Sequence, residues 1–376
     1  MLLDSRLLRA CGGGSIFGMS TLKVTAERLV IHPHPNADAL ELAEVGRLRA
    51  VVAKGAFRTG DHAVYLPEGS VLPEPLIAEL GLTGRLAGAS KDRITAVRLR
   101  GELSQGIVCL PKALSDLDLG QAAAAGTDFA EVLGVVKWNP PVPVHLAGDM
   151  TPAADLLPWL EVENIRRYPD LFTAGEPVIA TEKIHGSATL MTYVAATGAV
   201  YASSKGFGKQ RLAIKETGAN LYWRAVRTFD VPAFAGAVAA ALGAARVGVF
   251  GEVFGRGVQD LPYGANAGVR PGYAVFDVCV DAGDGVRWLT LDEYAPLAAE
   301  HGVPLVPVLY RGEYDEQELI ALADGVETVS GTGANLREGL VVRSVPERYS
   351  PVTGGRAIGK LVSPAYLTRK GGTEYE

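Results

Sequence analysis

The stretch of sequence around Lys183 contains the residues best suited to chemistry. It reads EKIHG over residues 182–186 and stands between two runs rich in β-forming residues, 178–181 and 188–193. A lysine at a strand end with apolar neighbours can lose part of its hydration. Such a loss disfavours the ammonium form and makes the neutral amine available as a nucleophile. The alternative is an ordinary surface lysine at a hairpin end, and this segment alone favours that alternative.

Two further segments carry polar or aromatic side chains that could serve such a lysine. Glu252 interrupts an apolar, glycine-rich strand, VGVFGEVFG. A buried carboxylate without a partner is costly, so we expect it to bind a cation, a hydroxyl or a metal, unless it faces solvent. Phe276 and Asp277 are neighbours in a later strand, YAVFDV, and should point to opposite faces. On its own, a phenylalanine in such a strand is more often a core residue than a base-stacking one.

The carboxy-terminal part adds a carboxylate and a second lysine. Glu338 opens the segment REGLVVR, and Lys360 lies in the apolar run AIGKLV. Each segment is weak evidence alone. The order of the four segments along the chain is more informative than any one of them.

These side chains need a scaffold, and the first hundred residues predict a small β-barrel. Short β-like runs between turn residues recur there, at 22–31, 40–45, 49–52, 62–65, 94–99 and 107–110. Four basic residues cluster along the fifth run and the loops beside it: Lys91, Arg93, Arg98 and Arg100. Arg98 and Arg100 would share one face of a strand. That face is either a surface for a nucleic-acid backbone or an ordinary solvated face.

The remainder divides at a proline-rich segment. We predict a disordered leader over 1–20 with Met19 as the true start, a barrel domain over 21–135, a semi-rigid linker over 136–159 and a second domain over 160–376. Two amphipathic helices are expected at 220–229 and 233–245.

Composition limits the classes of protein. The net charge is −6 and the pI about 5.7, which argues against indiscriminate nucleic-acid binding but allows a local basic groove. No apolar run reaches the about 20 residues that cross a bilayer, so no membrane association is expected. Three widely spaced cysteines support neither a disulfide framework nor a zinc site, and a cytoplasmic location is the simplest expectation.

The motifs in order resemble a known enzyme superfamily. Residues 183–186, KIHG, resemble the signature of the covalent nucleotidyltransferases, which include polynucleotide ligases and mRNA capping enzymes. With FGEVFG at 250–255, they are similar to the RNA ligases of the T4 RNA ligase 2 type. The segment HPNADALELAEV at 34–45 resembles the entry to an OB-fold of the tRNA-binding type. An OB-like domain ahead of the transferase domain resembles the Deinococcus RNA ligase family.

This resemblance implies a fold and an activity. The fold is α+β: an amino-terminal OB-like β-barrel, then a nucleotidyltransferase domain of antiparallel sheets with flanking helices. The implied activity is ATP-dependent RNA ligation through a lysyl-AMP and an adenylylated 5′ end, for RNA repair, with Mg²⁺ or Mn²⁺. The expected partner is RNA, as a nicked duplex of RNA with RNA or DNA, and no protein partner is implied. The alternatives are a DNA ligase or guanylyltransferase of the same superfamily, or an inactive nucleic-acid-binding relative.

The resemblance also assigns residues. Lys183 would be the nucleophile, and Phe276 would stack on adenine. Glu252 would bind the ribose or help to hold metal, Glu338 would coordinate metal, and Lys360 would contact the α-phosphate.

Further assignments concern the residues near the nucleophile. Glu182, Ile184 and Gly186 would help to form the nucleotide site, and His185 would act with the RNA 5′-phosphate or orient a loop. Lys205 stands where the family has an arginine, so its contact to the nucleotide or RNA end loses the bidentate fork.

The sequence departs from the family at one phosphate-binding position. The last motif of the T4 type has two alternating lysines, whereas Ile358 stands at the first position here. No glycine-rich phosphate loop is present either, so side chains must hold phosphates. Lys205, Lys209 and Arg211 are candidates, with a solvated basic loop as the alternative.

Overall fold

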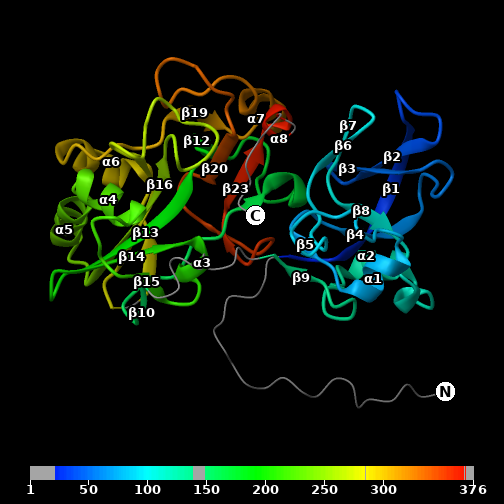
Figure 1. Ribbon diagram of the computed structural model, residues 1–376, viewed down its shortest axis with the longest axis horizontal. Coiled ribbons are helices and arrows are strands. Elements are labelled where there is room, and N and C mark those ends of the chain that lie inside the picture. Colours follow the sequence, from blue (N-terminus) through cyan, green and yellow to red (C-terminus); the bar gives the residue numbers. More distant parts are fainter. Residues whose placement is uncertain (1–21, 139–148, 284, 368, 370–376) are drawn as a thin grey trace, which may run out of the picture.

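The computed structural model describes residues 22–138, 149–283, 285–367 and 369. The predicted leader and residues 139–148 of the predicted linker lie outside this range. The described chain forms two domains, a smaller one on the right and a larger one on the left of Figure 1.

The smaller domain is built on a five-stranded antiparallel sheet. Its order is β3-β2-β1-β4-β8, with bounds Leu48–Ala53, Leu40–Val45, Thr25–Pro33, His62–Leu66 and Ile107–Cys109. Two short pairs accompany it, β5 (Ser70–Val71) with β9 (Val136–Lys137), and β6 (Val97–Leu99) with β7 (Glu102–Ser104). The helices are α1 (Glu74–Glu79), the 3₁₀ turn Lys112–Leu114 and α2 (Leu119–Ala125). The long β1 pairs with both β2 and β4, which curls the sheet into the expected OB-type barrel.

The larger domain contains two main sheets. The seven-stranded sheet has the order β10-β15-β14-β13-β16-β17-β18, with bounds Met150–Pro152, Leu212–Ile214, Ala199–Ser204, Ser187–Val194, Arg246–Phe254, Gly272–Asp281 and Val286–Trp288. The five-stranded sheet has the order β11-β23-β20-β12-β19, with bounds Glu163–Asn164, Ile358–Val362, Gly339–Ser344, Pro177–Lys183 and Val308–Glu313. A small hairpin joins β21 (Tyr349–Ser350) to β22 (Gly355–Arg356).

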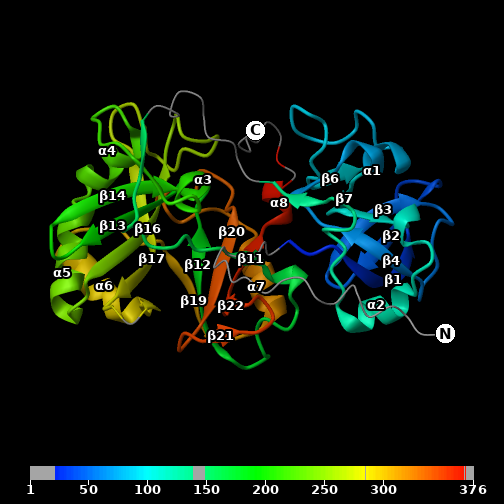
Figure 2. The same cartoon turned by 90° about the horizontal axis from the view of Figure 1, so that it is seen from below.

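Helices flank these sheets. They are the 3₁₀ turn Ile165–Arg167, α3 (Lys205–Gly208), α4 (Leu221–Thr228), α5 (Val231–Leu242), α6 (Leu291–Glu300), α7 (Glu316–Ala323) and α8 (Pro364–Leu367). Helices α4, α5 and α6 lie at the side of the seven-stranded sheet that is far from the smaller domain (Figure 2). The architecture is the α+β arrangement predicted above.

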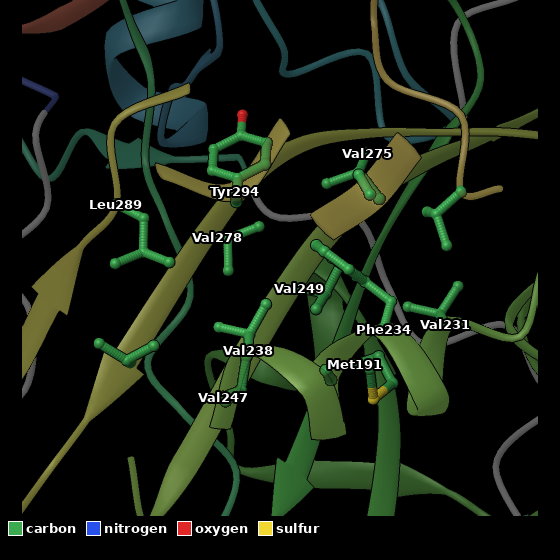
Figure 3. Close-up of a cluster of buried hydrophobic side chains, with 14 of the residues drawn as sticks. Met191, Val231, Phe234, Val238, Val247, Val249, Val275, Val278, Leu289 and Tyr294 are labelled. Atoms are coloured by element: carbon green, nitrogen blue, oxygen red, sulfur yellow. The ribbon is translucent and has the colours of Figure 1, made fainter. Parts of the chain in front are cut away.

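The main core lies between α5 and the central strands of the seven-stranded sheet. Phe234 and Val238 of α5 point toward Met191 of β13 and Val249 of β16 (Figure 3), and all four side chains are fully buried. Burial of one such side chain stabilises the fold by roughly 1.5 to 3 kcal/mol. This core fixes β13, which follows the turn after Lys183, and β16, against which that turn packs.

The predicted elements and the structure differ mostly at their ends. The strand expected at 94–99 is reduced to β6, and the helix expected at 233–245 begins earlier, at Val231. Both ends of the predicted 136–159 linker are built into sheets, since β9 pairs with β5 and β10 pairs with β15. Among the described residues, no single helix is long and apolar enough to cross a membrane; α4 and α5 pass only as a pair bent by 61°.

Polar contacts connect the two domains. Arg47, between β2 and β3, forms an ion pair with Glu316 of α7. Arg167 donates a hydrogen bond to the carbonyl of Lys23, at 3.2 Å. Lys137 of β9 lies 3.3 Å from Glu163 of β11. The last contact attaches the smaller domain close to the strand that carries Lys360.

Candidate active site

Lys183 ends β12 at a point where three strands of the five-stranded sheet meet. It lies opposite Gly339, the first residue of β20, so that Glu338 is beside it. The Lys183 ammonium is 2.8 Å from Glu338 Oε1. Lys360 lies on the next strand, β23, opposite Val341. Three segments separated by up to 177 residues of sequence thus bring the predicted nucleophile, carboxylate and second lysine together.

The seven-stranded sheet supplies the other side of the site. Its strand β13 begins directly after the turn that follows Lys183, and Ala188 of β13 lies opposite Glu252 of β16. The negative charge of Glu252 raises the pKa of Lys183. Lys205 begins α3, and its positive charge lowers the pKa of Glu252. The candidate site therefore lies where the two sheets converge.

Phe276 is displaced from the regular strand pattern by a β-bulge. In the pairing of β16 with β17, Phe250 lies opposite Asp277 and Gly251 opposite Val275, which leaves Phe276 without a partner. A bulge re-aims the extra side chain, and such bulges are common beside active sites. Phe276 is half-buried and packs against a hydrophobic cluster that includes Ile184, the residue after the nucleophile. This position suits the predicted stacking on adenine.

A buried ion network supports the bulge. Arg343 donates to the carbonyl of Phe276, at 2.8 Å, and lies 3.2 Å from Asp277. Arg356 donates to the other oxygen of Asp277, at 2.6 Å. Asp277 is fully buried, so these two cations compensate its charge. The sequence predicted opposite faces for Phe276 and Asp277 without revealing this network.

The electrostatics of Lys183 differ from the sequence-based expectation. Burial would lower its pKa, as predicted, but the negative charges of Glu338 and Glu252 outweigh burial and raise the pKa above the ordinary lysine value. Lys183 is therefore an ammonium ion at neutral pH in the unliganded protein. The expectation of a neutral amine is wrong for this state, because it ignored the carboxylates that the fold brings to the strand end.

Glu252 shows the opposite perturbation. Burial raises its pKa to about 8, and the charge of Glu338 adds to this rise. The charge of Lys183 and a hydrogen bond from the Gly186 backbone act against it. Glu252 therefore holds its proton to a higher pH than an ordinary glutamate does.

This raised pKa predicts a pH-dependent stability. The folded state holds a proton on Glu252 that the unfolded state releases above pH 4.5, so the contribution of this group to stability falls between about pH 4.5 and 8. Glu252→Gln should abolish this pH-dependent loss of stability. It should raise the free energy of unfolding at pH 8 by about 1 to 3 kcal/mol. Thermal unfolding of both proteins at pH 5 and pH 8 measures the effect. Equal stability of the two proteins at both pH values would contradict it.

Two further lysines have lowered pKa values. Loss of hydration and repulsion by the charge of Lys360 both lower the pKa of Lys205, although the residue as a whole is exposed. Its pKa falls to about 8. Burial and the charge of Lys183 lower the pKa of Lys360. Positive charge is thus concentrated beside the nucleophile.

Gly186 is required by close packing of the two sheets. A Cβ atom at this position would lie 2.3 Å from the carbonyl oxygen of Val253 and 3.0 Å from Cγ of Glu252. The motif glycine therefore lets the turn after Lys183 approach β16 directly.

Gly186→Ala should be strongly destabilising. The added methyl group meets backbone, which cannot move aside as a flexible side chain can, so we expect a loss of about 3 kcal/mol or more in the free energy of unfolding. Chemical denaturation measures this loss. Gly198→Ala is the matched comparison, because its Cβ would meet no atom within 4 Å and only its φ of +67° opposes it. A smaller loss at Gly186 than at Gly198 would contradict the packing argument.

Glu182 and Ile184, which are predicted to help form the nucleotide site, have side chains that are buried within the protein. The Glu182 carboxylate is fully buried and accepts hydrogen bonds from the backbone and hydroxyl of Thr328, so it anchors the loop before Glu338. Ile184 is buried in a cluster with Phe254. Alternation along the strand turns both side chains away from the face of Lys183, and their predicted role at the nucleotide stays a prediction.

His185 is held by the protein on both sides of its ring. Its Nε2 is 2.7 Å from Asp260, and its Nδ1 is 2.7 Å from the hydroxyl of Tyr366 in α8. Arg369 bonds both oxygens of Asp260, at 2.8 and 3.0 Å. Burial and the charge of Arg369 lower the pKa of His185. This arrangement agrees with the prediction that His185 orients a loop rather than with direct contact to a 5′-phosphate.

Sequence reasoning missed the partners of His185. Asp260 and Tyr263 lie in a loop of the seven-stranded sheet, and Tyr263 accepts a hydrogen bond from the His185 backbone, at 2.9 Å. Tyr366 and Arg369 follow the last predicted motif. None of these residues lies in a recognisable pattern, since the contacts span 75 to 184 residues of sequence.

The carboxylates of the site are suited to a hard cation. Within the described part of the chain, Glu338 Oε2 is buried and has no hydrogen-bond partner. Carboxylate oxygens are preferred ligands of Mg²⁺ and Mn²⁺. No group of three or more metal-binding side chains occurs among the described residues. Glu338 and Glu252 therefore fit an ion of the Mg²⁺ type, which keeps waters and substrate phosphates as its other ligands.

The predicted basic strand of the smaller domain is only partly correct. Arg93 is buried and stacks on Trp138 at 4.2 Å, and Lys91 lies in a loop with a positive φ of 54°. Arg98 is on β6, but Arg100 is in the following turn with a φ of 49°. The chain reverses after Leu99, so Arg98 and Arg100 do not share a strand face.

Comparison with known proteins identifies a family for the larger domain and a fold for the smaller one. Residues 176–362 match the model of the RNA ligase family, and residues 23–112 match a model of an OB-fold domain. Among curated proteins there is no match.

Solved structures extend the likeness over both domains. A Naegleria gruberi RNA ligase with pyrophosphate is 24% identical, with a TM-score of 0.70 over 92% of this chain and 97% of that one. A mutant of the same enzyme with ATP and Mn is 23% identical, with a TM-score of 0.72 over 92% of this chain and 98% of that one. At this identity the likeness establishes the shared fold.

Proposed function

This chain belongs to the RNA ligase family through residues 176–362, and on that premise we propose that it joins a 3′-hydroxyl to a 5′-phosphate at RNA nicks through a lysyl-AMP intermediate. The enzyme is an ATP-dependent RNA ligase. Structures of the Naegleria enzyme with ATP, AMP and Mn support the use of ATP and a divalent cation here.

In the first proposed step, the Lys183 amine attacks the α-phosphorus of ATP. An N–P bond forms and the bond from the α-phosphorus to the bridging oxygen breaks, which releases pyrophosphate. Glu338 Oε1 is the nearest acceptor for the proton that Lys183 must lose, at 2.8 Å. Lys360 and Lys205 are positioned to neutralise charge on the phosphates, which is the main requirement of phosphoryl transfer.

Glu338 and Glu252 have a further proposed role as ligands of a divalent cation. Glu338 and Glu252 would hold Mg²⁺ or Mn²⁺, which would reduce the charge of the triphosphate. Neutralisation of Glu338 and Glu252 also removes the two charges that keep Lys183 protonated. In the unliganded protein, Lys183 is therefore an ammonium ion and cannot act as a nucleophile.

In the second and third proposed steps, AMP moves from Lys183 to the RNA 5′-phosphate, and the 3′-hydroxyl then displaces AMP to form the phosphodiester. A nick in a duplex is favoured because the OB-fold domain offers a second surface beside the site. We include a cytoplasmic location and a role in RNA repair in this proposal.

The observation that carries the proposal is the contact of Lys183 with Glu338 at the junction of the two sheets, beside Glu252. A sealing assay tests it. Nicked duplexes with a 5′-phosphate are incubated with ATP and Mn²⁺, and the 3′ side of the nick carries either ribose or deoxyribose. We expect ATP-dependent sealing that prefers ribose. Preference for deoxyribose would favour a DNA ligase, and no sealing of any duplex would contradict the proposal.

A further inference from the structure

The carboxy-terminal helix α8 holds the ring of His185 through the hydroxyl of Tyr366. This hydroxyl is 2.7 Å from His185 Nδ1, and the two buried rings meet edge to face with centroids 5.3 Å apart. On the other side of the ring, Nε2 is 2.7 Å from Asp260. An ionised carboxylate can only accept a hydrogen bond, so this network assigns the proton of the neutral ring to Nε2 and makes Tyr366 the donor to Nδ1.

Tyr366 is itself fixed by its neighbours. The guanidinium of Arg369 stacks on the Tyr366 ring, 3.7 Å from the ring centroid, and bonds both oxygens of Asp260, at 2.8 and 3.0 Å. The backbone N–H of Tyr366 donates to the hydroxyl of Ser363, at 3.2 Å. The His185 ring therefore lies in a frame of three side chains that are joined to one another.

The start of α8 is anchored beside Glu338. Ser363 follows β23 directly, and its backbone N–H donates to the carbonyl of Glu338, at 2.9 Å. Residues 363–366 therefore contact both Glu338 and the turn after Lys183. Since Lys183 Nζ is 2.8 Å from Glu338, this short segment connects the two partners of that ion pair by a second route.

The turn after Lys183 depends on His185 for polar contacts by a side chain. Of its three residues, Ile184 lies in an apolar cluster and Gly186 has no side chain. The amine of Lys183 must approach the α-phosphorus in line with the leaving pyrophosphate. A displacement of about 1 Å in such a geometry can reduce a rate by about 100-fold.

We propose that Tyr366 is a positioning residue for the adenylylation of Lys183. Through His185 it holds the turn after Lys183 in a fixed place relative to Glu338, so that the amine keeps its in-line direction. This inference rests on the proposed function. The last step of ligation makes and breaks no bond to Lys183, so sealing of a nick that already carries AMP should not need Tyr366.

The experiment removes the hydroxyl alone. Tyr366→Phe keeps the ring on which Arg369 stacks, and it leaves the backbone bond between Ser363 and Glu338 in place. His185→Ala and the variant that combines both changes complete a double-mutant cycle.

Tyr310→Phe is the matched control in the same domain. It removes a tyrosine hydroxyl that donates to the carbonyl of Glu313 within β19, at 2.6 Å. Two reactions of the full chain are measured with Mn²⁺: adenylylation over a range of ATP concentrations, and sealing of a pre-adenylylated nick. Thermal unfolding reports whether each variant is folded.

We expect Tyr366→Phe to lower the maximal rate of adenylylation by about 10-fold and to change the half-saturating ATP concentration by less than about 3-fold. Sealing of the pre-adenylylated nick should stay within about 3-fold of the wild type, because Lys183 forms no bond in that step. In the His185→Ala background, Tyr366→Phe should change adenylylation by no more than about 2-fold, since it acts through His185. Tyr310→Phe should match the wild type in both reactions.

Three results would overturn the positioning role: wild-type adenylylation by Tyr366→Phe, an equal loss in sealing of the pre-adenylylated nick, or losses that multiply in the double variant. Failure of the wild-type protein to form an adenylate would instead overturn the proposed function.

Discussion

Lys183→Met is expected to reduce adenylylation of the enzyme, and sealing of 5′-phosphate nicks, by at least about 10⁴-fold. Methionine matches the length of lysine but has no nitrogen to form the bond to the α-phosphorus. The replacement also leaves Glu338 without the ammonium that lies 2.8 Å from it. The measurement is ATP-dependent sealing of a nicked RNA duplex at saturating ATP.

A pre-adenylylated RNA separates this effect from misfolding. The last step does not require a lysyl-AMP, so Lys183→Met should still seal a nick that already carries AMP on its 5′-phosphate. Lys215→Met, at an exposed lysine of the same domain, is the matched control and should seal both substrates normally. Sealing of ordinary 5′-phosphate nicks by Lys183→Met would contradict the role of this residue.

Glu338→Gln is expected to lower adenylylation by about 10²- to 10³-fold. The amide keeps the shape of the side chain but removes the charge that would hold a divalent cation. Glu338 also raises the pKa of Lys183, so its removal should move the deprotonation of Lys183 to lower pH. The test is the rate of adenylylation from pH 6 to 9.5 with Mn²⁺.

The pH profile distinguishes two roles of Glu338. If Glu338 only kept Lys183 protonated, the variant would be as fast as the wild type, or faster, near neutral pH. Loss of rate across the whole pH range is the outcome expected of a residue that also holds the cation. Glu300→Gln, at an exposed position at the end of α6, should behave as the wild type.

Local patterns predicted much of the scaffold. The apolar run before Lys183 predicted β12, and the run after Gly186 predicted β13, because strand periodicity and turn residues act over short distances. The order of the motifs placed Glu338 and Lys360 near the nucleophile. These assignments depend on short segments whose sequence pattern can be recognised without knowledge of their contacts.

Other features depend on contacts that no local pattern reveals. The bulge at Phe276 arises from a register shift between two strands, and the buried network around Asp277 forms only when that shift brings two arginines together. The raised pKa of Lys183 has the same origin, since its sign is decided by carboxylates from β16 and the residue before β20. Sequence reasoning considered burial alone and obtained the wrong sign.

The most direct test of the account is intact-mass and peptide mass spectrometry after incubation with ATP or GTP and Mg²⁺ or Mn²⁺. We predict one covalent AMP, formed from ATP and located on Lys183, with no adduct in Lys183→Met. No adduct on the wild-type protein, a GMP adduct in preference to AMP, or an AMP on another residue would contradict the central claim.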